Sequence, residues 1–146
     1  MQHLELIKKR VSHYYHQKEF NCATTNLKIL SEIHGIKLSP QVLDAAVGMH
    51  GAGTYGAQCG LVEGALLFIG IYGRSAGMSD SLIAEQCKTF AGKFEELFTS
   101  LRCEVLRPGG FQPDDPPHLC ENLTIDAIAA SVAFVSHMDN DDNRTR

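Results

Sequence analysis

The chain has 146 residues, 44% of them hydrophobic, with a net charge of −4 at pH 7 and a pI near 5.9. This length suits one domain that buries a core without disulfides, and the acidic balance argues against nucleic-acid binding or contact with an anionic membrane. No apolar stretch is long enough to insert into a bilayer. The N-terminus lacks the basic and apolar regions of a signal peptide, so we expect a cytoplasmic protein.

Helical periodicity dominates the first third of the chain. Its apolar stripe predicts a first helix over residues 2–18. A second helix is expected to begin after Asn21, a good N-cap, and to end at Gly35. The pair Ser39-Pro40 predicts the start of a short third helix, because serine caps and proline fits the first helical position.

A glycine-rich segment separates these helices from the rest of the chain. Residues 48–60 contain five glycines, which predicts a tight loop rather than an element. A fourth helix is expected over 58–72, and a fifth over 79–101 with Ser79 as its cap. Four of the five prolines fall within 107–117, so this segment is expected to be an extended connection.

A last helix is predicted over 119–138. Residues 139–146 have nothing to bury and are expected to form a disordered tail. No run shows the sustained alternation of a strand. The prediction is an all-α, single-domain bundle of five to six helices over residues 1–138, with the glycine-rich loop before the fourth helix. Its apolar helices are compatible with a homodimer, although no residue specifies one.

Four of the five cysteines lie at or beside predicted helix ends. Cys22 follows the N-cap of the second helix, Cys59 opens the fourth and Cys120 opens the last. A helix N-terminus stabilises a thiolate, the form that attacks disulfides and binds metals. Cys103 is expected at the C-terminal end of the fifth helix, where the dipole opposes a thiolate. Cys87 lies in the apolar stripe of that helix and is interpreted as packing.

Each of these residues has a second interpretation. Free cysteine is among the most buried residue types, so each could be a small core residue. His118 is a candidate to stabilise the thiolate of Cys120 or to act as a ligand, or it is a solvated loop side chain. The glycine-rich loop before Cys59 offers backbone N–H groups to a phosphate, a cluster or a thiolate, or it is only a turn.

The spacing of the cysteines excludes several common sites. No C-x-x-C pair is present, which argues against zinc ribbons, thioredoxin-type motifs and bacterial ferredoxin signatures. The four cysteines at helix ends are 37, 44 and 17 residues apart along the chain. A site that they share must therefore be assembled by folding.

The segment Asn21-Cys-Ala-Thr-Thr-Asn26 resembles the signature that names the C_GCAxxG_C_C family of redox-active proteins. The resemblance runs from about Phe20 to the last helix. Family members are similar in length and are marked by four invariant cysteines, which match Cys22, Cys59, Cys103 and Cys120. Asparagines replace both glycines of the signature. Asn21 can still cap the helix, whereas Asn26 lies inside it and weighs against close packing of a neighbour.

The resemblance implies redox chemistry or cluster binding at these four cysteines. The first hypothesis is an iron–sulfur cluster for electron transfer, or structural zinc, held by the cysteines with His118 beside them and served by an electron-transfer partner. The second is metal-free thiol–disulfide exchange, in which Cys22 or Cys59 attacks. The chain is thus a candidate oxidoreductase or electron carrier.

A third hypothesis needs no thiol chemistry. The chain is then a small-ligand or interaction module with structural cysteines. In that case the glycine-rich loop, with Met49, His50 and Tyr55, binds a small anion at the start of the fourth helix.

Overall fold

The computed structural model describes residues 3–107, 109, 114, 115 and 118–145. Within these residues the chain forms eight helices and no strand, which confirms the predicted all-α class. The helices are α1 (Leu4–His16), α2 (Cys22–His34), α3 (Pro40–Ala45), α4 (Gly51–Thr54), α5 (Gly60–Ser75), α6 (Asp80–Phe98), α7 (Cys103–Leu106) and α8 (Glu121–Thr145). The single turns α4 and α7 are the two that periodicity did not predict.

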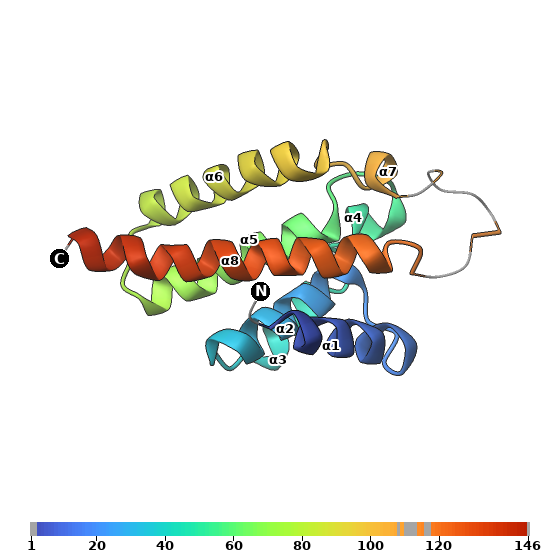
Figure 1. The fold of residues 1–146 in the computed structure, drawn as a ribbon, viewed down its shortest axis with the longest axis horizontal. Coiled ribbons are helices and arrows are strands. Elements are labelled where there is room, and N and C mark those ends of the chain that lie inside the picture. The colour runs from blue at the N-terminus through green and yellow to red at the C-terminus, as the bar shows by residue number, and fades with distance from the viewer. Residues whose placement is uncertain (1–2, 108, 110–113, 116–117, 146) are drawn as a thin grey trace.

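The long helices lie in layers around α8. Figure 1 shows α8 across the middle of the molecule with α5 beside it, α1, α2 and α3 on one side, and α6 on the other. The short helices α4 and α7 lie close together at one end of this bundle. None of the described helices combines the length and the apolarity that crossing a bilayer requires.

Local chemistry sets the helix ends that the sequence predicted. The Oδ1 atom of Asn21 accepts a hydrogen bond from the N–H of Thr24 at 2.8 Å and caps α2. Gly35 ends the same helix with a φ of 69°, which glycine adopts without strain. The hydroxyl of Ser79 caps α6 by accepting from the N–H of Leu82 at 3.2 Å. These three predictions are confirmed.

The glycine-rich segment is a tight turn, as predicted, although one turn of it is classed as helix α4. Ala52 and Gly53 both have positive φ, 54° and 66°, so this turn is not a regular right-handed helix. Its chain returns to the start of α5 through a hydrogen bond from the N–H of Gly51 to the carbonyl of Gln58 at 3.1 Å.

The predicted fifth helix ends early, and the position expected for Cys103 is therefore wrong. α6 stops at Phe98, and Thr99 takes the C-cap with a φ of 77°. Cys103 then begins the separate helix α7. Residues 101–104 leave the helix because their backbone pairs with residues 56–59 instead. Leu97, an apolar residue near the end of α6, is 65% exposed.

Close contact between α2 and α5 forms the centre of the core. A Cβ on Gly64 of α5 would lie 2.6 Å from the carbonyl oxygen of Ala23 on α2. Asn26 is fully buried in this contact, and its Nδ2 donates to the carbonyl of Leu61 at 2.8 Å. The expectation that Asn26 opposes close packing is wrong, because its amide bonds directly to the neighbouring helix.

Two further predictions, on residues 107–117 and 139–146, are only partly tested by the structure. The extended connection over 107–117 lies mostly outside the described residues. The backbone of α8 is helical through Thr145, so residues 139–145 continue the last helix. Disorder of residues 139–146 in solution stays a prediction, as does the single-domain organisation.

Candidate functional site

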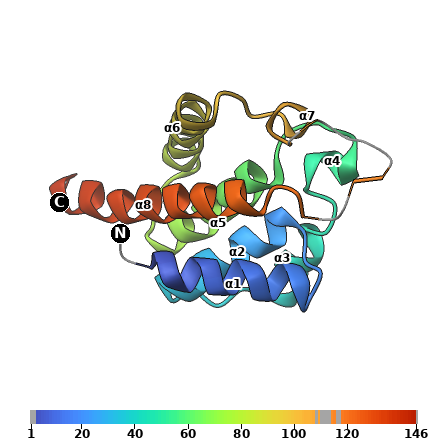
Figure 2. The same ribbon diagram turned by 45° about the vertical axis from the view of Figure 1, so that its right-hand side comes forward.

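The structure places four cysteines where four different helices begin. Cys22 and Cys103 are the first residues of α2 and α7, Cys59 is the N-cap of α5, and Cys120 directly precedes α8. Backbone N–H groups without helical partners and the positive end of the helix dipole are found at such positions. Figure 2 shows the starts of α2, α7 and α8 at one end of the bundle.

The thiols of these four cysteines are gathered into one site. These four cysteines form six pairs, and in each pair the electrostatic interaction raises the pKa of one of the two thiols. Three of the pairs involve Cys22, two more involve Cys59, and the last joins Cys103 to Cys120. Among the described residues, Cys87 stands apart, and burial alone raises its pKa. We call Cys22, Cys59, Cys103 and Cys120 the thiol centre.

Backbone pairing holds Cys59 beside Cys103. The N–H of Cys59 donates to the carbonyl of Leu101 at 2.7 Å, and the N–H of Cys103 donates to the carbonyl of Ala57, also at 2.7 Å. These bonds flank an isolated antiparallel bridge between residues 58 and 102. Two cysteines that are 44 residues apart in sequence thus start their helices next to each other.

Two glycines leave room for the sulfur atoms. A Cβ on Gly60 would lie only 2.3 Å from the Sγ of Cys22. A Cβ on Gly51 would lie 3.1 Å from the Sγ of Cys103, and Gly51 also has a φ of 66°. The glycines at these two positions therefore serve the thiol centre as well as the turn.

Burial governs the protonation of the inner thiols. It raises the pKa of Cys59 to about 12, although the N–H groups of Leu61 and Val62 oppose the shift. The pKa of Cys22 is raised further, mainly by desolvation of its sulfur and next by Cys59. Cys22 keeps some exposed surface, but its sulfur packs against Gly60. A helix N-terminus alone does not produce a thiolate here.

Cys103 and Cys120 form the more accessible side of the centre. Both are partly buried, and burial is again the main cause of their raised pKa values. The guanidinium group of Arg107 opposes the shift at both thiols. Arg107 also lies near Asp115, with 3.6 Å between Nε and Oδ2.

Tyr15 borders the centre, and the sequence did not single it out. Its hydroxyl lies 2.7 Å from the Oγ1 of Thr124 in the interior. Burial, and then the thiols of Cys22, Cys120 and Cys59, raise its pKa well above the ordinary value. The only signal in the sequence was its place in the apolar stripe of the first helix, because a buried tyrosine needs a partner for its hydroxyl.

His118 is held beside Cys120 by aromatic packing. Its ring stacks on Tyr15 with 4.2 Å between the ring centroids, and it meets His16 edge-on at 6.0 Å. Burial and the nearby His16 lower the pKa of His118, against opposing effects from Glu121 and Glu19. A histidine that stays neutral keeps a nitrogen lone pair. Its role as a ligand stays a prediction.

A sequence model of the family described as "Putative redox-active protein (C_GCAxxG_C_C)" matches residues 20–133, which include the whole thiol centre. The chain belongs to this family. The resemblance drawn from Asn21 to Asn26 is therefore confirmed. Neither a curated protein nor a solved structure matches the chain.

The donor set of this C_GCAxxG_C_C protein fits the cofactors that its sequence suggested only in part. Four cysteine sulfurs are the ligand set of iron–sulfur clusters and of structural zinc. As the side chains stand, however, no three His, Cys, Asp or Glu residues within the described parts of the chain are arranged to hold a single metal ion. The four donors therefore match these groups in chemistry, whereas the described side chains offer no ready site for one metal ion.

Two residues of the third hypothesis, Met49 and His50, line different cavities. Met49 lines a small cavity beside α4, whereas His50 lines a different one beside the start of α2. Tyr55 is 86% exposed. His50 instead supports α2, since its Nδ1 accepts from the Nδ2 of Asn21 at 3.2 Å.

Proposed function

We propose that this C_GCAxxG_C_C protein is a redox protein whose thiol centre binds an iron–sulfur cluster and carries electrons. The observation that supports the proposal is the gathering of four of the five cysteines, from four separate segments, at one end of the bundle. The family's redox description agrees with it. The more general statement, that the chain is a redox-family protein with several cysteines, does not depend on the cluster.

The electrostatics of the centre favour a cationic occupant. Burial disfavours a thiolate at all four positions, and repulsion from other thiols adds to this at Cys22, Cys59 and Cys103. Metal binding makes cysteine lose its proton, because the cation offsets the negative charge that burial opposes. When bound, such a cluster supplies one-electron transfer. The N–H groups of Leu61 and Val62, which favour negative charge at Cys59, would also stabilise this residue as a thiolate ligand.

The test is purification without oxygen, followed by iron and sulfide analysis and a visible absorption spectrum. We expect stoichiometric iron and sulfide and a visible absorption band. Changing any cysteine of the thiol centre to serine should abolish or strongly reduce the band. Cys87→Ser is the matched control and should retain it, because Cys87 has no electrostatic contact with the centre. Colourless protein that contains zinc would reject electron transfer.

Metal-free thiol–disulfide exchange is the second candidate, and the lack of a ready three-ligand site within the described residues favours it. In this reaction two thiols of the centre become a disulfide and release two protons and two electrons. A small disulfide such as oxidised glutathione accepts them and leaves as two thiols. Cys103 and Cys120 are the more accessible pair. An unchanged thiol count after treatment with oxidised glutathione would eliminate this candidate.

A further inference from the structure

The end of the molecule that contains the thiol centre also exposes apolar side chains. Leu97 at the end of α6 is 65% exposed, and Val105 on α7 is 59% exposed. Tyr55, after α4, is 86% exposed. The N–H of Glu104 donates to the carbonyl of Gly56 at 3.2 Å, so the chain next to Tyr55 is bonded to the chain next to Val105. Single exposed apolar residues are ordinary, whereas several on adjoining elements indicate contact with another molecule.

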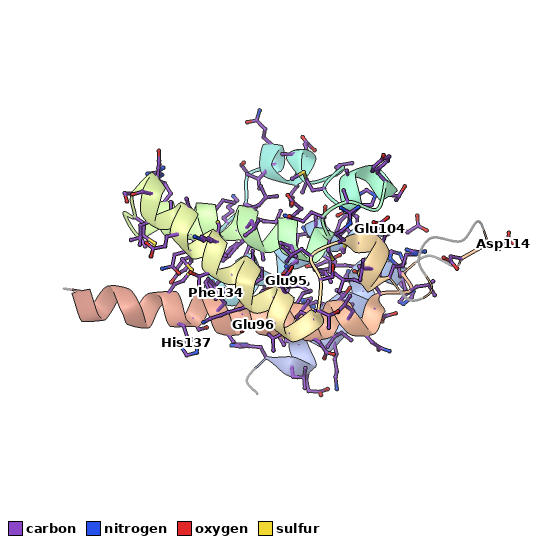
Figure 3. The ribbon with its side chains drawn as sticks, turned by 90° about the horizontal axis from the view of Figure 1, so that it is seen from above. Glu95, Glu96, Glu104, Asp114, Phe134 and His137 are labelled. Atoms are coloured by element: carbon purple, nitrogen blue, oxygen red, sulfur yellow. The ribbon has the colours of Figure 1, made fainter. Side chains whose placement is uncertain are left out.

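Carboxylates accompany these apolar side chains. Glu95 and Glu96 precede Leu97, Glu104 precedes Val105, and all three acids are exposed. Figure 3 shows Glu95 and Glu96 on α6 and Glu104 on α7, with the molecule seen from above. Arg102 pairs with Glu104 at 2.7 Å. Within the described residues Glu95 and Glu96 make no ion pair, so this surface carries net negative charge.

The basic side chain nearest to these acids in the sequence of α6 is Lys93, which lines one groove together with Glu96. The ammonium group of Lys93 lies over the ring of Phe134 on α8, 5.4 Å from its centroid. Leu97 lines the same seam between the two helices, so Lys93 lies beside the surface and offsets part of its negative charge. The three acids still outnumber Arg102 and Lys93, and the surface stays net negative.

This surface lies beside the accessible side of the thiol centre. Cys103 is the first residue of α7, adjacent to Glu104 and two residues before Val105. Its thiol is only partly buried. A protein that contacts α7 would therefore approach the centre at its more exposed thiols.

We propose that this surface docks a redox partner protein whose own contact face is apolar and surrounded by lysine or arginine. We call it the α6–α7 surface and define it as Tyr55, Glu95, Glu96, Leu97, Glu104 and Val105. Tyrosine and aliphatic side chains supply the contact area, and the carboxylates steer a basic partner and fix its orientation. Contacts of this kind between redox proteins are small and transient. The identity of the partner as a redox protein rests on the proposed function; the surface itself does not.

The test uses cytochrome c, a small basic haem protein, as the probe. Its addition to the ¹⁵N-labelled protein at low ionic strength is expected to shift the amide resonances of residues 95–97 and 103–106. The shifts should weaken as salt is raised toward about 0.15 M, where the screening length falls to about 8 Å. Shifts that map to another face, or the absence of binding at low salt, would overturn the proposal.

Two sets of charge reversals distinguish the effect of this surface on binding from the effect of the protein's net charge. The surface variant combines Glu95→Lys, Glu96→Lys and Glu104→Lys. The control combines Glu5→Lys, Asp44→Lys and Asp80→Lys, which are also exposed and change the net charge equally. We expect about tenfold weaker binding for the surface variant and less than about twofold for the control, since local complementarity governs the encounter. Equal losses in both would contradict the proposal. Circular dichroism checks that both variants fold.

A second pair of variants tests the apolar part of the surface at constant charge. Leu97→Ser with Val105→Ser should weaken binding, whereas Leu82→Ser, at an exposed leucine near the other end of α6, should not. Binding by iron-free protein at this surface supports the proposal whatever the centre holds. Iron-loaded protein that binds here but exchanges no electrons with cytochrome c counts against the proposed function alone.

Discussion

At the residue scale, the thiol centre depends most directly on Gly60. The Sγ of Cys22 occupies the space that a Cβ on this residue would need, because such a Cβ would lie 2.3 Å from that sulfur. The neighbours are backbone and a buried sulfur, neither of which can move aside cheaply. The helix propensity of glycine is poor, so the residue is present at the start of α5 for space and not for helix formation.

Gly60→Ala is therefore expected to destabilise the fold by about 1–3 kcal/mol, the usual cost of forcing extra volume into a packed site. Gly70→Ala in the same helix is the matched control, because nothing lies within 4 Å of its added Cβ. This control should be neutral or more stable by up to about 1 kcal/mol. Urea unfolding monitored by circular dichroism measures both. Equal effects of the two substitutions would show that the contact with Cys22 is unimportant.

The raised pKa of Cys59 predicts a pH dependence of stability in the reduced, metal-free protein. The thiol has a pKa of about 12 in the folded protein, against about 8.5 in an unfolded chain. Between these values the folded protein keeps a proton that the unfolded chain loses. Stability is thus fully present below about pH 8.5 and falls as the pH rises through this window. Cys59→Ser should reduce the slope of unfolding free energy between about pH 8 and 10. An unchanged slope would argue against burial of this thiol.

At the scale of elements, Asn21 connects three segments. Its Oδ1 caps α2, and its Nδ2 donates to the carbonyl of Val47 at 2.7 Å and to His50 at 3.2 Å. One asparagine therefore stabilises both the helix that starts with Cys22 and the chain that leads into the glycine-rich turn. The family signature has glycine at this position, which can supply the backbone conformation but none of these bonds.

Asn21→Gly separates the two roles. If capping were the only contribution, replacement by glycine would cost a few tenths of a kcal/mol. Because the bonds to the loop are also lost, we expect a cost of about 1–2 kcal/mol. His50→Ala provides a partial control that removes one of those partners and leaves the cap. Thermal unfolding of the two variants measures the difference, and a cost of only a few tenths would show that the loop contacts contribute nothing.

The elements also show which features local sequence can predict. The ends of α2 and α6 have local causes, in Asn21, Gly35 and Ser79, and these were predictable. The end of α6 near Phe98 is set by backbone pairing with residues 56–59, which no neighbouring residue signals. Helical periodicity extended the predicted helix to the next apolar residue. The position predicted for Cys103 was wrong for that reason.

The same distinction applies to the thiol centre. Helix propensity and glycine content predicted that Cys22 and Cys59 start helices. They could not show that the four sulfurs meet, because the meeting depends on how helices pack and on reciprocal bonds between distant loops. Tyr15 was missed for the same reason. Its contact with the centre arises only when α1 packs against α8.

At the scale of the whole molecule, the family match begins at residue 20 and so leaves α1 outside it. The structure makes α1 part of the same core, since Ile7, Val11 and Tyr15 are buried. Tyr15 also reaches the thiol centre. The functional unit of this chain thus includes an element that the family model does not cover.

Truncations at the two ends should consequently differ. Removal of residues 139–146 is expected to change the unfolding free energy by less than about 0.5 kcal/mol, because the sequence there has nothing to bury. Removal of residues 1–16 should prevent cooperative folding, since it deletes three buried core side chains. Urea or thermal denaturation distinguishes the two. A large loss on removing the C-terminal residues would refute the tail assignment.

The origin of the thiol centre in four segments has a consequence for biosynthesis. Cys22 and Cys120 are 98 residues apart, so the ribosome makes the last cysteine about 5–20 s after the first at ordinary elongation rates. During that interval the nascent polypeptide displays an incomplete set of sulfurs that no finished packing protects. Occupancy of the centre by any prosthetic group is thus a late event in maturation, and the growing chain is most vulnerable to adventitious oxidation before translation ends.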